Sequence, residues 1–69
     1  MPATYAIKIR GRLGETMLHA FPGLAAERSG DCTLLRGLLR DQAALHGVIA
    51  QIEALGLELV EVRQVPQGQ

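Results

Sequence analysis

The side chains that could carry out chemistry are few and scattered in this sequence of 69 residues. Cys32 is the only cysteine, and His19 and His46 are the only histidines. A metal site would need these three side chains to converge from separate elements, because no CxxC, HxxxH or HxH spacing is present. The two histidines are typical of surface residues that bind water or their neighbours, and Cys32 of a small, partly buried residue. We therefore expect no metal and no other cofactor.

Pro2 is the one residue that raises a specific catalytic alternative. Removal of the preceding methionine would leave a proline amine at the N-terminus, and the short tautomerases use such an amine as a general base. The similarity ends within the first few residues. Those enzymes continue from their first strand into a long helix, whereas Gly14 and Pro22-Gly23 interrupt the corresponding segment here. A tautomerase-like enzyme is thus a remote alternative, and we expect no catalytic residue.

A small ligand could bind in the segment from Gly11 to Glu15. Arginines flank Gly11 on both sides, and the start of the following helix would offer free amide groups to an anion. Regulatory domains of the ACT type bind amino acids at such a strand–helix loop. An ACT-like sensor that uses Gly11, Arg12 and Gly14 is therefore the main alternative function. Solvated charges at the end of a strand explain the same residues.

Composition argues against several classes of protein. Seven basic residues balance seven acidic ones, which disfavours a dedicated nucleic-acid-binding protein. Tyr5 is the only aromatic residue in a predicted strand, and it falls with the core-facing residues, so no base could stack on it. No apolar run approaches the roughly 20 residues of a membrane span, and the N-terminus lacks the apolar core of a signal peptide. We expect a soluble, cytoplasmic protein with no nucleic-acid or membrane partner.

The first half of the chain predicts a strand, a short helix and a hairpin. Residues 4–13 alternate between apolar and polar side chains, as a half-buried strand does. Apolar residues at helical spacing over residues 15–21 predict two turns of helix at most. Residues 24–28 and 32–39 flank the turn Ser29-Gly30-Asp31, so we expect two strands joined in a hairpin.

The second half predicts a longer helix followed by a strand. Asp41 is a good N-cap, and apolar residues then recur at steps of three and four as far as Leu55. Gly56 stands where the left-handed residue after a helix belongs. Beyond it the period shortens to two, which predicts a strand with Leu59 and Val65 on the same face as Glu61.

These elements predict an α+β fold of the ferredoxin-like, split βαβ type, in the order β-α-β-β-α-β. We expect one domain over residues 1–65 and a flexible tail over residues 66–69. Right-handed crossovers and short connections give a four-stranded antiparallel sheet in the order 4-1-3-2, with both helices on one face. The first and last strands are then neighbours, which would place Glu61 across from Lys8 or Arg10 on the open face.

Two predicted surfaces lack the charged residues that exposed surfaces normally carry. The outer side of the long helix is a strip of small residues, and a glycine within a helix costs roughly 0.5–1 kcal/mol relative to alanine. The sheet carries more leucines than its inner face can bury, and an exposed apolar patch usually marks an interface. A core of this size also contributes little net stability by itself. The residues concerned are Ala43, Gly47, Ala50 and Ala54 on the helix and Leu34, Leu38 and Leu59 on the sheet.

The segment L-x-G-x-L-x-D-Q-A-A-L-H-G-V-I-x-x-I-x-x-L-G-L-x-L, from Leu35 to Leu59, resembles a group of short uncharacterised bacterial proteins of actinobacterial type. The strand pattern Y-x-I-x-I-x-G-x-L, from Tyr5 to Leu13, is similar to the same group. The resemblance implies no activity and transfers no site residue.

We predict a small interaction or regulatory module that associates with itself, first of all as a dimer, and that is not an enzyme. A different protein partner is the second option. Gly47→Glu is expected to break the association if the helix strip forms the interface.

Overall fold

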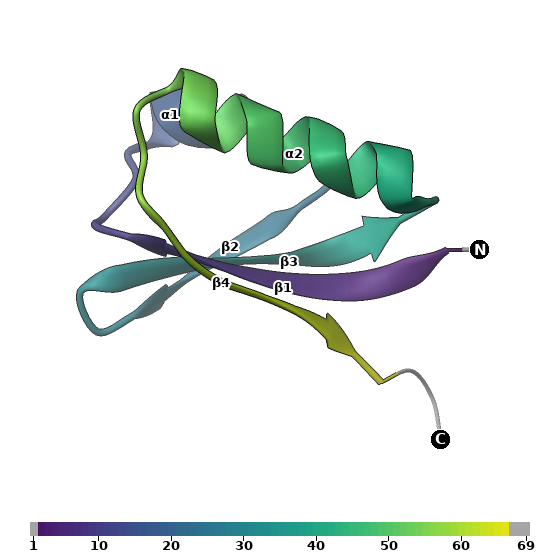
Figure 1. Cartoon of the computed structure of the whole chain (residues 1–69). Coiled ribbons are helices and arrows are strands. Elements are labelled where there is room, and N and C mark those ends of the chain that lie inside the picture. The colour runs from purple at the N-terminus through teal and green to yellow at the C-terminus, as the bar shows by residue number, and fades with distance from the viewer. Residues whose placement is uncertain (1, 67–69) are drawn as a thin grey trace.

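The structure, a computed structural model, describes residues 2–66 and has the predicted order of elements (Figure 1). The predicted tail, residues 66–69, lies outside the described residues except for Pro66. The elements are β1 (Ala3–Arg10), α1 (Glu15–Leu18), β2 (Ala25–Ser29), β3 (Cys32–Leu39), α2 (Gln42–Ala54) and β4 (Leu59–Val65).

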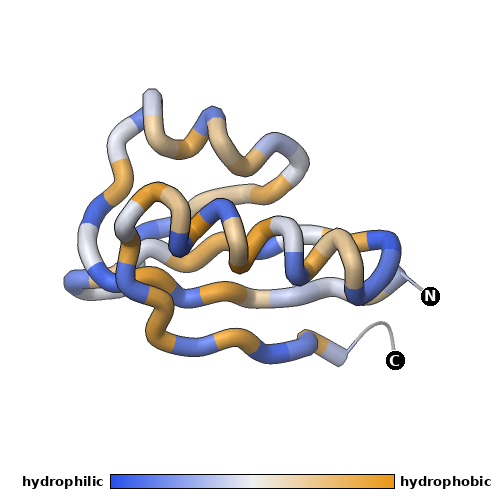
Figure 2. The backbone as a smooth tube through the Cα atoms, turned by 45° about the horizontal axis from the view of Figure 1, so that its top comes forward, coloured by the Kyte–Doolittle hydropathy of each residue, from blue (hydrophilic) through white to orange (hydrophobic). Residues whose placement is uncertain are grey.

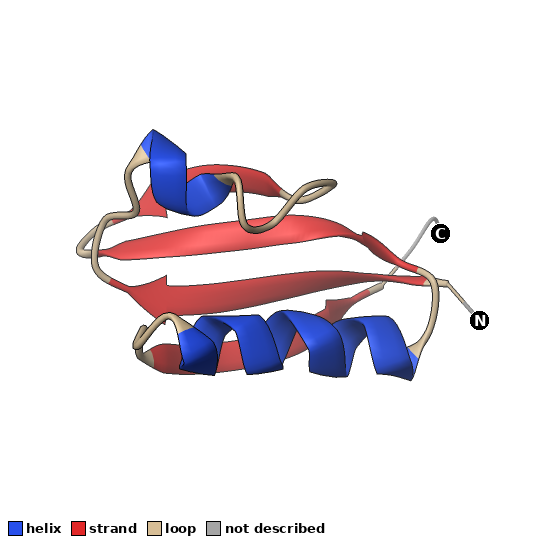
Figure 3. Cartoon of the chain, turned by 90° about the horizontal axis from the view of Figure 1, so that it is seen from above, coloured by secondary structure: helices blue, strands red, loops and turns tan. Residues whose placement is uncertain are grey.

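The four strands form one antiparallel sheet in the order β2-β3-β1-β4, which confirms the predicted topology. Both helices lie on the same side of this sheet (Figure 1). Seen from above, α2 runs along the side of β1 and β4, and α1 lies toward β2 (Figure 3). The fold is therefore the ferredoxin-like α+β arrangement. One face of the sheet is covered by helices, and neither helix covers the other face.

The core lies between the sheet and the helices and is mostly aliphatic, as the composition requires. Tyr5 packs against it, as predicted. From α2, Ile52 is fully buried, and hydrophobic residues recur along this helix and the strand after it (Figure 2). The buried hydrophobic cluster consists of Ile7, Ile9, Phe21, Leu35 and Ile52.

A β-bulge in β4 corrects one prediction. Lys8 pairs with Glu61, but the next residue, Ile9, pairs with Leu59, so Val60 is an extra residue in the ladder. The extra residue reverses the alternation of side chains along the strand. Leu59 therefore packs against the core instead of lying on the face of Glu61, and its predicted place on the open face is wrong. Val60 takes the exposed position, with 43% of its surface accessible.

The helix α2 begins and ends where the sequence predicts, because local signals define both of its ends. The Asp41 side chain accepts a hydrogen bond of 2.8 Å from the Ala44 N–H, which satisfies one of the free amides of the first turn. At the other end Gly56 has φ +74°. The N–H groups of Gly56 and Leu57 donate to the carbonyl oxygens of Glu53 (3.0 Å) and Ile52 (3.1 Å). This pair of bonds is the Schellman motif, and Leu57 packs back on the core.

The helix α1 is shorter than expected, with four residues instead of the predicted 15–21. The N–H groups of Ala20 and Phe21 donate to the carbonyl oxygens three residues earlier, Met17 and Leu18, so the chain tightens into turns after Leu18. Phe21 is nevertheless buried. Its apolar spacing thus reflects packing against the core and not a second helical turn.

Candidate functional site

The open face of the sheet is the surface on which the charged and apolar side chains of four strands meet. Because the strands pair in register, these side chains form rows across the sheet. The leucine row holds Leu38, Thr4 and Val65. The arginine row holds Ala25, Arg36, Ala6 and Arg63, and the glutamate row holds Glu27, Leu34, Lys8 and Glu61.

Among residues 2–66, Leu38 is the most exposed large hydrophobic residue, with 60% of its surface accessible. It lies on β3, an inner strand, and its neighbours in the leucine row, Thr4 and Val65, are half-buried. Leu34, further along β3 on the same face, is half-buried. The prediction that Leu34 and Leu38 lie on the open face is confirmed. Whether they form an interface stays a prediction.

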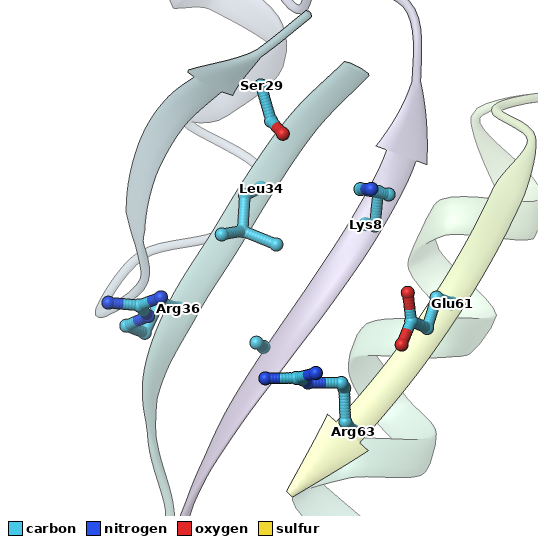
Figure 4. Close-up of a pocket in the computed structure, with 7 residues that line it drawn as sticks. Lys8, Ser29, Leu34, Arg36, Glu61 and Arg63 are labelled. Atoms are coloured by element: carbon cyan, nitrogen blue, oxygen red, sulfur yellow. The ribbon is translucent and has the colours of Figure 1, made fainter. Parts of the chain in front are cut away.

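A hollow of about 190 Å³ opens in the middle of this face. Ala6 contributes to its lining, and only 5% of the surface of this residue is accessible. Longer side chains from β1, β3 and β4 line it, namely Lys8, Arg36, Arg63 and Glu61. In Figure 4, Arg63 extends from β4 toward β1, and Arg36 extends from β3 toward β2. Ser29 and Leu34 complete the lining. This hollow could not be predicted from the sequence, because it depends on which residues the register places side by side.

The positive charges of the hollow are only partly compensated. Arg36 Nη2 lies 3.9 Å from Glu27 Oε1, and both side chains are more than half exposed, so this pair contributes little. Lys8 and Glu61 are paired in register, as predicted, but their charged groups are not within ion-pair distance in the described chain. Arg63 likewise has no carboxylate partner among residues 2–66.

Arg10, the other predicted partner of Glu61, is instead joined to Glu58. Arg10 Nε lies 3.2 Å from Glu58 Oε1, and the Arg10 N–H donates to the Glu58 carbonyl oxygen at 2.9 Å. This contact lies at the start of β4, beyond the bulge. It leaves Glu61 beside Lys8 and Arg63 in the middle of the face.

The small residues of the helix strip share the exposed side of α2, as predicted. Ala43, Gly47, Ala50 and Ala54 are all exposed. A Cβ added at Gly47 would meet nothing within 4 Å, so the packing of a single chain does not require glycine there. Gly47 also lines a hollow of about 320 Å³ between α2 and the turn at Pro22. That the strip is an interface stays a prediction.

The predicted ligand loop is occupied by its own hydrogen bonds. The Gly11 N–H donates to the Asp31 carbonyl oxygen at 2.7 Å. The hydroxyl of Thr33, a residue with 6% of its surface accessible, donates to the Gly11 carbonyl oxygen at 2.8 Å and accepts from the Leu13 N–H at 3.2 Å. Of Gly11, Arg12 and Gly14, Arg12 alone borders the hollow of about 240 Å³ near this loop. The anchoring role of Thr33 could not be predicted, because it depends on a contact 20 residues away in the sequence.

The residues with potential for other chemistry lie apart. His19 and His46 are exposed, and Cys32 is half-buried on the open face opposite Arg10. In the part of the chain that the structure describes, no three His, Cys, Asp or Glu side chains come together as a set of metal ligands. Pro2 is exposed before β1 and lines none of the three hollows described above.

Comparison with known proteins gives a family and no activity. A family model described as a domain of unknown function (DUF8691) matches residues 4–63. This match agrees with the predicted resemblance only in that the family is uncharacterised. Neither a curated protein nor a solved structure matches the chain. Among residues 2–66, no helix is long and apolar enough to span a membrane.

Proposed function

We propose that this chain, which belongs to the DUF8691 family, is a small interaction module that associates with a second copy through the open face of its sheet. In this role it would act as a regulatory or structural partner and not as an enzyme. The observation that carries the proposal is the exposure of Leu38 on a sheet face that neither helix covers.

Burial of Leu38 would stabilise a dimer. Full burial of a leucine side chain contributes about 1.5–3 kcal/mol relative to leaving it exposed. In a two-fold symmetric dimer the same surface of both subunits forms the interface, so two copies of Leu38 are buried. Leu34 and Val65, which are half-buried on the same face, would add to the contact.

The size of the face sets the strength that we expect. Strands of up to eight residues and a sheet of four strands give a face of about 26 Å by 19 Å, or about 500 Å² before the relief of the side chains is counted. A standard interface buries about 800 Å² per partner. The dimer would therefore lie at the small end of stable interfaces, and we expect micromolar affinity.

Two variants that add the same charge distinguish the sheet face from the helix strip. Leu38→Lys places a lysine on the open face, and Ala50→Lys places one on the exposed side of α2. Both positions are exposed, so both variants should fold. We expect Leu38→Lys to weaken the dimer about 100-fold or more, because two buried leucines are lost per dimer. Ala50→Lys should leave the affinity unchanged.

Sedimentation velocity from low to high micromolar concentration measures both variants against the wild type, and circular dichroism checks their fold. The reverse pattern, in which Ala50→Lys and Gly47→Glu abolish the dimer and Leu38→Lys does not, would assign the interface to the helix strip. A wild-type chain that stays monomeric over the whole range would refute self-association.

A further inference from the structure

The hollow in the arginine row has the composition of a site for a small anion. We propose that it binds an oxyanion of the phosphate class, either inorganic phosphate or the phosphate group of a small phosphorylated molecule. This site goes beyond the proposed self-association and does not depend on it.

Charge is the first argument for the site. Lys8, Arg36 and Arg63 line the hollow, and Glu61 is the one carboxylate in the lining, which leaves a net charge of +2. The Glu27 carboxylate approaches Arg36 only to 3.9 Å, so it would compete weakly with a ligand. Two guanidinium groups and an ammonium group supply the charged N–H donors that phosphate oxygens accept.

Shape is the second argument. Ala6 lies in register between Arg36 on β3 and Arg63 on β4, at a strand position where β-branched and aromatic residues are more usual than alanine. Its small side chain leaves room between the two arginines. At about 190 Å³, the hollow is smaller than the roughly 300–1,000 Å³ of sites for drug-sized ligands. A single phosphate group suits this size better than a nucleotide does.

The side chains around the hollow also favour a small anion over a nucleic acid. Single-stranded RNA and DNA are held on sheet faces by aromatic side chains that stack on the bases. The two aromatic residues of the chain, Tyr5 and Phe21, both belong to the core. The hollow offers positive charge and hydrogen-bond donors, including the Ser29 hydroxyl, but no stacking surface.

A titration followed by ¹H–¹⁵N NMR tests the site. Sodium phosphate is added to the full chain, and sodium chloride at matched ionic strength serves as the reference. We expect saturable shifts at the backbone amides of Ala6, Arg36 and Arg63. A parallel titration with methyl phosphate distinguishes the two candidate ligands. If methyl phosphate binds as tightly as inorganic phosphate, the site accepts a phosphate ester. If methyl phosphate binds more weakly, the site prefers inorganic phosphate.

Three variants locate the binding. Arg63→Gln should weaken it about tenfold or more, because one charged hydrogen-bond donor is lost. Ala6→Val should weaken it similarly by filling the hollow without changing any charge. Arg12→Gln removes an arginine from the loop near Leu13 and should leave the affinity unchanged, so it is the matched control for Arg63→Gln.

Several results would overturn the proposal. Shifts that fail to saturate, or that chloride reproduces, would show that phosphate only screens the surface. Loss of binding in Arg12→Gln but not in Arg63→Gln would assign the anion to the hollow of about 240 Å³ that Arg12 lines. If Ala6→Val does not fold, Arg63→Gln still decides the question, since Arg63 is exposed. Sedimentation under the same conditions reports self-association separately.

Discussion

Among the glycines between residues 11 and 56, Gly37 is the one with the least room for a side chain. It lies on β3 directly against the turn at Pro22, and a Cβ there would lie 2.6 Å from Leu24 Cδ2 and 2.8 Å from the Gly23 carbonyl oxygen. The second of these atoms belongs to the backbone, so the contact cannot be relieved by a rotamer change alone. Glycine at this position lets the turn approach the sheet.

We therefore expect Gly37→Ala to destabilise the fold by about 1–3 kcal/mol, the usual cost of overpacking. In a domain of this size each kcal/mol lowers the melting temperature by about 4–8 °C. Thermal unfolding followed by circular dichroism measures the change. An unchanged melting temperature would mean that the turn does not lie against β3 as described.

The environments of two residues, Gly37 and Leu59, could not be predicted correctly from the sequence. Gly37 could be placed on the core-facing side of its strand by alternation, but the turn that requires it is distant in the sequence. Strict alternation predicts Leu59 on the open face, which is wrong because the extra residue Val60 shifts the register. The adjacent apolar residues Leu59 and Val60 were the available signal that a bulge interrupts the strand.

Among the elements, α2 was predictable to within a residue because its boundaries are local. Asp41 and Gly56 act on amide and carbonyl groups within a few positions of themselves. The helix α1 lacks such a signal at its start, because its N-cap is Gly14, which has no side chain to accept a hydrogen bond from the first turn. Its length is fixed instead by the turns that carry Phe21 into the core.

Gly47 weakens α2 without a packing reason in the single chain, so Gly47→Ala should stabilise the fold. We expect a gain of about 0.5–1 kcal/mol, because alanine has less backbone entropy to lose and the added methyl group meets nothing within 4 Å. Chemical denaturation measures the gain, and Gly37→Ala is the contrasting variant. A loss of stability would show that the site is more crowded than the structure indicates.

The two edge strands, β2 and β4, have charged side chains, and β4 also has a β-bulge, and these features hinder pairing with further strands. Glu27 and Arg28 lie on β2, and Glu61 and Arg63 lie on β4 beside the bulge at Val60. Charges and bulges on edge strands hinder the addition of another strand. Association through the face is therefore favoured over association through the edges.

At the scale of the whole molecule, the sheet order follows from rules that the sequence could supply, namely element order, handedness and short connections. The open-face hollow could not be predicted, because it needs the register of three strands at once. The apolar part of that face was foreseen in Leu34 and Leu38, since the inner face had no room for them.

The sheet order also sets which part of the molecule opens last. β1 and β3 are each bonded to strands on both sides, whereas β2 and β4 each have one neighbour. We expect the amide groups of β1 and β3 that form these pairings to exchange with solvent most slowly, near the rate set by global unfolding. Those of β2 should exchange faster. Hydrogen exchange by NMR measures both, and equal protection of β2 and β1 would contradict this ranking.

The central position of β1 has a consequence for biosynthesis. Among the described elements this strand is synthesised first, yet its two neighbours are β3 and β4, and β4 is synthesised last. About 55 residues separate the end of β1 from the end of β4, which corresponds to about 3–11 s of synthesis at 5–20 residues per second. During that interval Ile7 and Ile9 have no complete core to enter. These two side chains therefore reach their full native burial only after the last strand of the sheet has been made.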